Sequence, residues 1–142
     1  MPTPSFINDQ RGVSVTDLKK TILVVDDAAL TRLYYRSTLE ESGFHVEEAL
    51  NGLEALEKLL TSPADLLIVD VNMPQMDGFT FLNVLRRKER PLAAIPALVT
   101  STESAEKDFA AARAAGANYY LVKPIDRETL VEFATLLCGV QR

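Results

Sequence analysis

The chain has little of several residue types, and each scarcity excludes a class of protein. Its single cysteine excludes an internal disulfide and fits a reducing compartment. No apolar run approaches the roughly 20 residues of a membrane span, and the N-terminus lacks the basic-then-apolar pattern of a secretory signal. Basic residues are not in excess: the net charge of -5 argues against general affinity for nucleic acid or anionic lipid. We therefore expect a cytoplasmic protein that binds neither nucleic acid directly nor a membrane.

The composition and length indicate one globular domain preceded by an arm. With 142 residues, 47% hydrophobic and 25% charged, the chain can bury one sizeable core and shows no repeat or low-complexity tract. Residues 1–18 contain two prolines, Gly12 and scattered polar groups without periodicity, apart from a weak extended signal at 13–15. We expect a mobile N-terminal arm over 1–18 and the folded domain over 19–142.

Short apolar runs alternate with amphipathic segments along the domain. The expected strands lie at 21–25, 44–49, 65–70, 95–99 and 118–122. The expected helices lie at 29–42, 52–61, 78–90 and 103–115, and after Asp126. This order predicts an α/β fold, a doubly wound five-stranded parallel sheet with five helices on its two faces and right-handed crossovers.

The apolar residues of three helices predict which side of each helix meets the sheet. The expected buried positions are Leu30, Leu33, Tyr34 and Leu39 in the first helix, Leu53, Leu56, Leu59 and Leu60 in the second, and Leu130, Phe133, Ala134 and Leu137 in the last. Asn51 and Glu54 have the spacing of a capping box at the start of the second helix.

Polar side chains stand at the ends of four expected strands. Asp26 and Asp27 end the first, Asp70 the third, Thr100 the fourth, and Lys123 follows the fifth. The carboxyl ends of parallel strands share one edge of the sheet, where ligands of such folds bind. We expect these five side chains to converge in one crevice.

That set of groups suits phosphoryl transfer. Three carboxylates repel one another unless a cation joins them, and hard oxygen ligands favour Mg²⁺. A carboxylate such as Asp70 can attack phosphorus and form an acyl phosphate. Mg²⁺ and Lys123 would offset the charge on the phosphoryl oxygens, and the Thr100 hydroxyl could donate to one of them. The sequence therefore predicts Mg²⁺-dependent phosphorylation of an aspartate.

From about Lys20 to Val140 the chain resembles the receiver domain of two-component response regulators, most closely the single-domain chemotaxis (CheY-like) type. The matching motifs are Val24-Val25-Asp26-Asp27, Asp70 with Met73-Pro74-Gln75-Met76-Asp77-Gly78, Thr100-Ser101, and Tyr120-Leu121-Val122-Lys123-Pro124. The resemblance implies a flavodoxin-like sheet with strand order 2-1-3-4-5, counting the five expected strands along the chain.

The resemblance also implies a role for each residue of the crevice. Asp70 would be the phosphoacceptor, and Asp26 and Asp27 would position Mg²⁺, with Asp27 the more direct ligand. The metal would also be bound by Asp70 and by the backbone carbonyl of Asn72. Lys123 would pair with the phosphoryl group, and its peptide bond to the following proline is cis in the family.

A switch between two states follows from the same resemblance. Thr100 would turn toward the phosphoryl group and Tyr120 would move into the space that this vacates, which alters the face formed by the fourth helix, fifth strand and fifth helix. Ser101 stands where the family usually has a smaller residue, and Asn72 and Thr102 occupy positions that tune the lifetime of the phosphoryl group.

The implied function is a signalling switch rather than an enzyme. A sensor histidine kinase, a phosphotransfer protein or acetyl phosphate would supply the phosphoryl group, and a downstream protein target would read the state of the fourth-helix, fifth-strand, fifth-helix face. Its only chemistry would be Mg²⁺-dependent self-phosphorylation and autodephosphorylation. It would act as a monomer or as a phosphorylation-dependent dimer. The kinase, the pathway and the role of the arm are left open by the sequence.

Three other functions would draw on the same residues or the same fold. An aspartyl phosphatase wants a carboxylic acid two residues after the nucleophile, where this chain has Asn72. A flavodoxin-like cofactor binder needs a phosphate-cradling loop after the first strand, where Asp26 and Asp27 would repel a phosphate. A degenerate receiver acting only as a scaffold would not need all five polar positions filled.

Simpler structural roles compete for single residues. Asp26 or Asp27 could cap a helix, Thr100 and Lys123 could be ordinary strand-end residues, and Tyr120 could serve packing alone. Outside the crevice, the basic run at 86–90 predicts a solvated helix end. His45 is expected at the surface, and Cys138 is expected to be buried.

Overall fold

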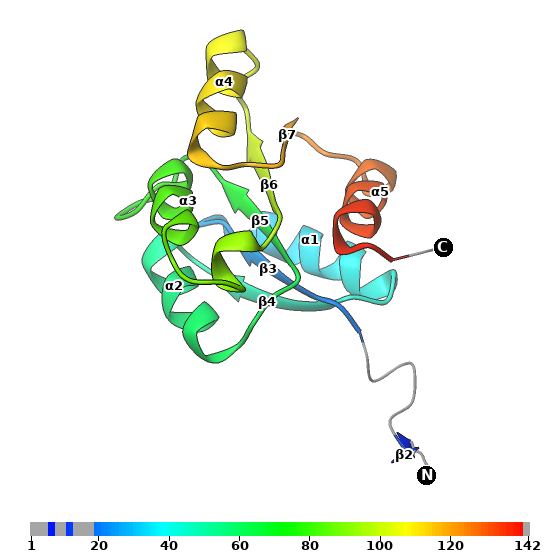
Figure 1. Ribbon diagram of the computed structural model, residues 1–142. Coiled ribbons are helices and arrows are strands. Elements are labelled where there is room, and N and C mark those ends of the chain that lie inside the picture. The colour runs from blue at the N-terminus through cyan, green and yellow to red at the C-terminus, as the bar shows by residue number, and fades with distance from the viewer. Residues whose placement is uncertain (1–5, 8–10, 13–18, 141–142) are drawn as a thin grey trace.

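A five-stranded parallel sheet with helices on both faces forms the domain, in the order β4-β3-β5-β6-β7 (Figure 1). The computed structural model describes residues 6–7, 11–12 and 19–140. The strands are β3 (Thr21–Val25), β4 (His45–Ala49), β5 (Leu66–Asp70), β6 (Ala97–Ser101) and β7 (Tyr119–Val122). The helices are α1 (Ala29–Glu41), α2 (Gly52–Thr61), α3 (Gly78–Arg86), α4 (Glu106–Ala115) and α5 (Arg127–Cys138), with a 3₁₀ turn η2 at Leu92–Ala94. This confirms the predicted fold class and the strand order 2-1-3-4-5.

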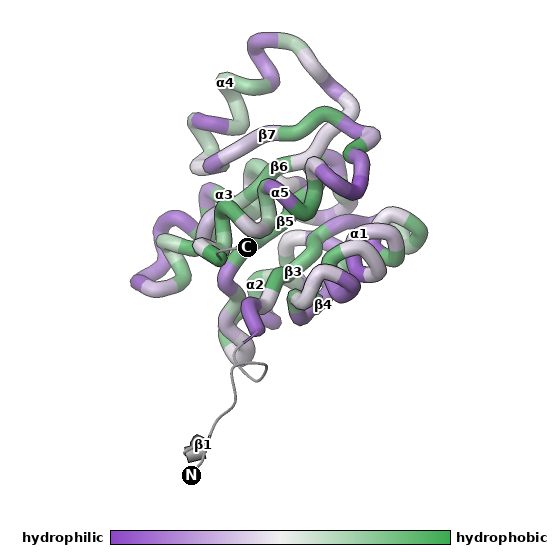
Figure 2. The backbone as a smooth tube through the Cα atoms, turned by 90° about the vertical axis from the view of Figure 1, so that its right-hand side faces the viewer, coloured by the Kyte–Doolittle hydropathy of each residue, from purple (hydrophilic) through white to green (hydrophobic). Residues whose placement is uncertain are grey.

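Two hydrophobic cores fill the space between the sheet and its helices. Alternate residues of each buried strand point to opposite faces, so Leu23 and Val25 pack with α2 and α3 while Ile22 and Val24 pack with α1 and α5. Figure 1 shows α1 and α5 on one side of the sheet and α2 and α3 on the other. In Figure 2, β3 and β5 run as hydrophobic stretches through the middle of the domain. The continuous apolar runs of the sequence thus reflect burial on both faces.

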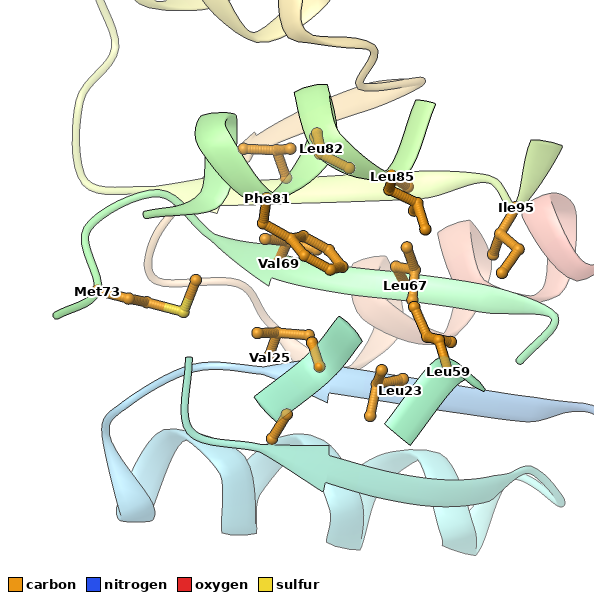
Figure 3. Close-up of a cluster of buried hydrophobic side chains, with 14 of the residues drawn as sticks. Leu23, Val25, Leu59, Leu67, Val69, Met73, Phe81, Leu82, Leu85 and Ile95 are labelled. Carbon is orange, nitrogen blue, oxygen red and sulfur yellow. The ribbon is translucent and has the colours of Figure 1, made fainter. Parts of the chain in front are cut away.

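Phe81 of α3 anchors the first of these cores. It is fully buried and lies beside Val69 of β5 in Figure 3, close to the point where β5 reaches Asp70. Met73, in the loop just after β5, packs into the same cluster. The strand that carries Asp70 is therefore held on both faces and along both edges, because β3 and β6 flank it.

The register aligns the polar strand ends. Val25 of β3 pairs with Val69 of β5, and Asp70 pairs with Thr100 of β6. Strand β6 lies two residues later than the expected 95–99, so Thr100 is inside the strand rather than after it. The pairing brings Thr100 directly opposite Asp70.

The exposed leucines of two helices contradict part of the predicted burial. In α1, Leu30 is 81% and Leu33 is 58% exposed, and the buried residues are Tyr35, Thr38 and Leu39. In α2, Leu53 and Leu60 are exposed, whereas Leu59 is buried as predicted. The other buried residues of α2 are the small Gly52 and Ala55. A Cβ on Gly52 would lie 2.9 Å from Phe81 of α3, so the glycine allows α2 to pack closely against α3.

The basic run after α3 is only partly solvated. The helix ends at Arg86, four residues earlier than expected. Arg87, Lys88 and Arg90 are exposed, as predicted. The guanidinium of Arg86 instead donates to the backbone carbonyls of Gly116, Ala93 and Ile95, and so ties α3 to the segments before β6 and β7.

The start of the fourth helix differs from the prediction, whereas the exposure of His45 and the burial of Cys138 agree with it. The fourth helix begins at Glu106 rather than 103. His45 is exposed beside Glu47, and Cys138 is buried, both as predicted; burial raises the pKa of the Cys138 thiol to about 11. Among the described residues, no helix is long and apolar enough to cross a membrane.

The N-terminal arm contains a short paired segment. Strands β1 (Phe6–Ile7) and β2 (Arg11–Gly12) pair antiparallel, which the sequence pattern did not predict. The extended signal at 13–15 falls outside the described residues, and the mobility of the arm stays a prediction.

Candidate functional site at the carboxyl edge of the sheet

Three carboxylates meet at the carboxyl edge of the sheet, as the strand ends predicted. One oxygen from each of Asp26, Asp27 and Asp70 lies within 4.8 Å of the others. Asp26 is 1% and Asp70 is 7% exposed, whereas Asp27 faces solvent. The Asp26 amide donates to the carbonyl of Ala49 at 3.1 Å, and its Oδ1 accepts from the Ala28 amide at 2.8 Å. These bonds fix the turn from β3 into α1 and thereby hold the Asp26 carboxylate in the cluster.

Lys123 joins two of the carboxylates. Its Nζ lies 2.9 Å from Asp70 Oδ1 and 3.1 Å from Asp26 Oδ2. The Lys123 amide donates to the Ser101 carbonyl at 2.7 Å, and the peptide bond to Pro124 is cis, as the resemblance implied. The β6–β7 pairing therefore delivers the ammonium to the acidic cluster.

Burial and charge shift the pKa values of this pair. Burial raises the pKa of Asp70; Lys123 partly offsets this, and the charges of Asp26 and Asp27 add to the rise. Burial alone would lower the pKa of Lys123, but its hydrogen bond to Asp70 and the charge of Asp26 outweigh burial and raise it. Lys123 is thus held as a cation beside a carboxylate that its surroundings only incompletely stabilise.

The cluster fits a divalent cation. Three carboxylates face a single ammonium, so an excess of negative charge remains for a cation to offset. Oxygen donors at this spacing suit Mg²⁺, which takes few protein carboxylates and retains waters. Asn72, whose backbone carbonyl the resemblance adds to the ligands, is exposed in the loop two residues after Asp70.

Thr100 brings an unpaired hydroxyl to the same place. It is fully buried, and among the described residues its Oγ1 makes no hydrogen bond of good geometry, although the Tyr35 hydroxyl lies close enough for Thr100 to influence the pKa of Tyr35. A buried hydroxyl without a partner is costly, which favours a role with a ligand or a second state. Asp70 Oδ1 is bound by Lys123, and Asp70 lies opposite Thr100 in the sheet. A phosphoryl group on Asp70 would give the hydroxyl an acceptor.

Tyr120, the residue expected to switch, is fixed away from this hydroxyl. It is half-buried on β7, and its hydroxyl donates to the carbonyl of Glu103 at 2.8 Å. Its ring packs edge-on against Phe109 of α4, with centroids 4.8 Å apart. Ser101 is buried, and its Oγ accepts from the Glu103 amide at 3.0 Å, which shapes the same loop. Thr102 is exposed in that loop.

Gly78 keeps the start of α3 against Asp70. A Cβ at this position would lie 2.4 Å from the Asp70 carbonyl oxygen, so only glycine fits without a backbone shift. The Gly78 amide donates to the Val71 carbonyl at 2.9 Å, and Asp77 caps α3 through the Thr80 amide at 2.8 Å. The Asp77-Gly78 motif therefore has a geometric cause.

Two residues around the cluster, Tyr35 and Arg32, were not predicted from the sequence. Tyr35 is buried beside Lys123 and Thr100; burial raises its pKa to about 12, although Lys123 and Thr100 oppose the rise. Arg32 donates to the Asp26 carbonyl at 2.8 Å and pairs with Glu48 of β4. A helical face through Tyr35, Thr38 and Leu39 was present in the sequence, but the leucines at 30 and 33 obscured it.

Comparisons with known proteins agree on one family. The sequence model of the response regulator receiver domain family matches residues 22–135 of this chain. Chemotaxis protein CheY1 of Helicobacter pylori is 36% identical over 120 residues, which cover 83% of this chain and 96% of that protein. The autoinducer sensor kinase/phosphatase CqsS of Vibrio cholerae is 31% identical over 113 residues, and the match spans 80% of this chain but only 16% of CqsS.

Solved structures support the same assignment. The chemotaxis protein CheY4 of Vibrio cholerae superposes with a TM-score of 0.78 at 35% identity, covering 84% of this chain and 98% of that one. The receiver domain of a histidine kinase from Syntrophus aciditrophicus gives a TM-score of 0.78 at 31% identity, covering 87% and 93%. With the family model matching most of the folded domain and the polar strand ends in place, this chain belongs to the response regulator receiver domain family of two-component signalling.

Proposed function

We propose that this chain is a phosphorylation-controlled signalling switch whose phosphoacceptor is Asp70. The observation that carries the proposal is the convergence of Asp70 with Lys123 at 2.9 Å, inside a cluster of three carboxylates. The unpartnered hydroxyl of Thr100, opposite Asp70 in the sheet, supports it independently. Receiver domains generally bind Mg²⁺ at an acidic pocket, and Asp26, Asp27, Asp70 and the carbonyl of Asn72 are the ligands that we assign here.

The transfer would proceed by attack of the Asp70 carboxylate on phosphorus. A new oxygen–phosphorus bond forms while the bond from phosphorus to the donor breaks, and the donor leaves with that electron pair. A phosphohistidine donor leaves as imidazole, and acetyl phosphate leaves as acetate. Lys123 and the Thr100 hydroxyl would bind separate phosphoryl oxygens, and the bound Mg²⁺ would supply further charge compensation.

The switch would couple this chemistry to the β7 side of the domain. When the Thr100 hydroxyl turns to the phosphoryl group, it vacates space toward which the Tyr120 ring can move. Tyr120 would then release the Glu103 carbonyl, to which it donates at 2.8 Å, and the α4-β7-α5 face would change. Tyr119 and Val122, both exposed on β7, would form part of the surface that a downstream protein reads.

The chemistry we propose is stoichiometric rather than enzymatic. A phosphatase would need a proton donor two residues after the nucleophile, and the amide of Asn72 is far too weak an acid to protonate a leaving alkoxide. A sensor histidine kinase or a phosphotransfer protein would donate the phosphoryl group, as receiver domains imply. The protein would act as a monomer or as a phosphorylation-dependent dimer.

The test uses the two aspartates that bracket β5. The protein is incubated with Mg²⁺ and acetyl phosphate, and the adduct is detected by intact mass; beryllofluoride with amide NMR shifts gives a second readout. We expect one adduct per chain in wild type and none in Asp70→Asn. Asp65→Asn, at the opposite end of the strand where Asp65 accepts from the Thr21 amide, should retain it.

Two results would contradict the assignment. Absence of adduct in wild type would refute the switch, and an adduct that persists in Asp70→Asn would refute the site. Catalytic turnover of a phosphorylated metabolite would favour the phosphatase that we rejected.

A further inference from the structure

Arg32 of α1 links the acidic cluster to an ion pair on the neighbouring strand. Its Nη1 donates to the Asp26 carbonyl at 2.8 Å, and its Nε donates to Glu48 Oε1 at 2.8 Å. Only 13% of the Arg32 side chain and 29% of the Glu48 side chain are exposed. One guanidinium thus joins the end of β3, where the metal-binding turn begins, to β4.

Arg36, one helical turn later, uses the same carboxylate without reaching the cluster. Its Nε donates to Glu48 Oε2 at 2.6 Å, and its Nη1 donates to Glu40 at 2.8 Å. Burial alone would raise the pKa of Glu48, but hydrogen bonds from Arg36 and Arg32 lower it overall, so Glu48 is ionised at neutral pH. The chain therefore offers two arginines that share Glu48 but differ in their contact with Asp26.

Besides Arg32, the turn from β3 into α1 is held by three contacts of Asp26: its amide donates to the Ala49 carbonyl, its Oδ1 accepts from the Ala28 amide, and its Oδ2 pairs with Lys123. The N-cap residue of α1 is Ala28, which has no side-chain acceptor, so helix capping does not fix the turn. The carboxylate of Asp26 thus bonds within the turn, whereas its carbonyl accepts from Arg32 of the following helix. A planar guanidinium donates in fixed directions, so Glu48 on one edge of the fork sets where the other edge points.

The charge of Arg32 would by itself disfavour this arrangement. A cation near a divalent-cation site repels the metal, and Glu48 compensates that charge through its ion pair. Arg32 then contributes a hydrogen bond that orients the Asp26 carbonyl rather than a net charge near the metal site.

We propose that Arg32, oriented by Glu48, is a positioning residue for the divalent-cation site: it fixes the Asp26-Asp27 turn so that both carboxylates converge with Asp70. This inference rests on the metal site of the proposed function. It assigns no ligand role to Arg32, which acts through the backbone of Asp26.

The test compares Arg32→Met with Arg36→Met, because each removes one ion pair with Glu48 and only the first removes the contact with Asp26. Mg²⁺ affinity is measured by amide NMR shifts without any phosphodonor. We expect Arg32→Met to weaken binding roughly tenfold, the lower end for groups that orient metal ligands. Arg36→Met should stay within about twofold, as for a partly exposed ion pair.

The sign of the effect separates positioning from charge. If Arg32 mattered only as a nearby cation, its removal would tighten Mg²⁺ binding, so tighter or unchanged binding overturns the inference. Arg32→Lys keeps the charge but not the fork, and weaker binding is expected there too. If Arg32→Met does not fold, Arg32→Lys replaces it as the test of positioning.

A metal-free readout completes the design. Amide hydrogen exchange at Asp27 and Ala28 should accelerate in Arg32→Met and not in Arg36→Met, at matched stability in urea. Equal exchange in both variants overturns the inference while leaving the proposed function intact. A wild type that binds no Mg²⁺ overturns the proposed function, and this inference with it.

Discussion

Strands β5 and β7 belong to the same sheet but have opposite surroundings. All five residues of β5 are buried, with β3 and β6 along its edges and helices on both faces. No residue of β7 is fully buried; β7 is an edge strand of the sheet, and Tyr119 is 45% and Val122 is 38% exposed. Yet Asp70, the last residue of β5, and Lys123, the residue directly after β7, form one ion pair.

Under the proposed function, this difference would divide the work of the domain between the two strands. A nucleophile needs a fixed, largely dehydrated position, and β5 would provide it because every neighbour constrains this strand. A surface that a partner reads needs access and freedom to change, and β7 would provide both. Lys123 follows β7 directly, so the buried chemistry and the exposed face are joined through one short segment.

The largest expected effect is a difference in the free energy of unfolding that is lost when a leucine is truncated in β5 and in β7. Leu67→Ala in β5 should lower the free energy of unfolding by about 2–5 kcal/mol, because a fully buried leucine leaves a cavity that rigid neighbours cannot fill. Leu121→Ala in β7 removes the same atoms from a half-buried site and should cost about half of that or less. Urea unfolding measures both. Equal losses would show that the edge strand is as constrained as the centre.

Gly78→Ala tests how tightly the end of β5 is enclosed. Its new Cβ would meet the Asp70 carbonyl at 2.4 Å, so α3 or the strand must shift, at about 1–3 kcal/mol of unfolding free energy. Gly43→Ala is the control, since nothing lies within 4 Å of a Cβ there although its φ is +98°. The Asp70 amide should shift in NMR spectra of Gly78→Ala only. An unperturbed Asp70 would contradict the close approach.

The smallest expected effect is a difference in pH dependence between two aspartates. Because burial raises the pKa of Asp70, the folded state binds that proton more tightly than the unfolded chain. The stability from protonated Asp70 is complete below the ordinary pKa of 3.8 and is lost as pH rises through the raised value. In metal-free buffer, the stability of Asp70→Asn relative to wild type should therefore increase toward neutral pH.

Asp126, after β7, should show the opposite sign. It caps α5, and the hydrogen bond from the Thr129 amide lowers its pKa. Its stabilisation is present above pH 3.8 and is lost as pH falls through the lowered pKa. The stability of Asp126→Asn relative to wild type should decrease toward neutral pH. Urea unfolding over a pH series measures both variants, and parallel curves would refute the contrast.

The sequence determined the strands and the composition of the crevice. The central run from Leu66 to Val69 is apolar throughout, as expected for a strand buried on both faces, and a carboxylate at the end of such a strand lies at the edge of the sheet. The positions of Asp26, Asp27, Asp70, Thr100 and Lys123 followed from this topology alone. The metal and phosphoacceptor roles assigned to them stay predictions until they are measured.

The tertiary structure alone decided which face of each helix is buried and which contacts position the acidic cluster. Leu30 and Leu33 lie outside while Tyr35 lies inside, because the fit against the sheet outweighs hydrophobicity once the helix has a fixed axis. The bond from Arg32 to the Asp26 carbonyl occurs together with the ion pair to Glu48 of β4, so, unlike a helix cap, it depends on how separate elements pack and could not be predicted from residue spacing. Strand ends can be read locally, whereas the contacts that position them depend on how separate elements pack together.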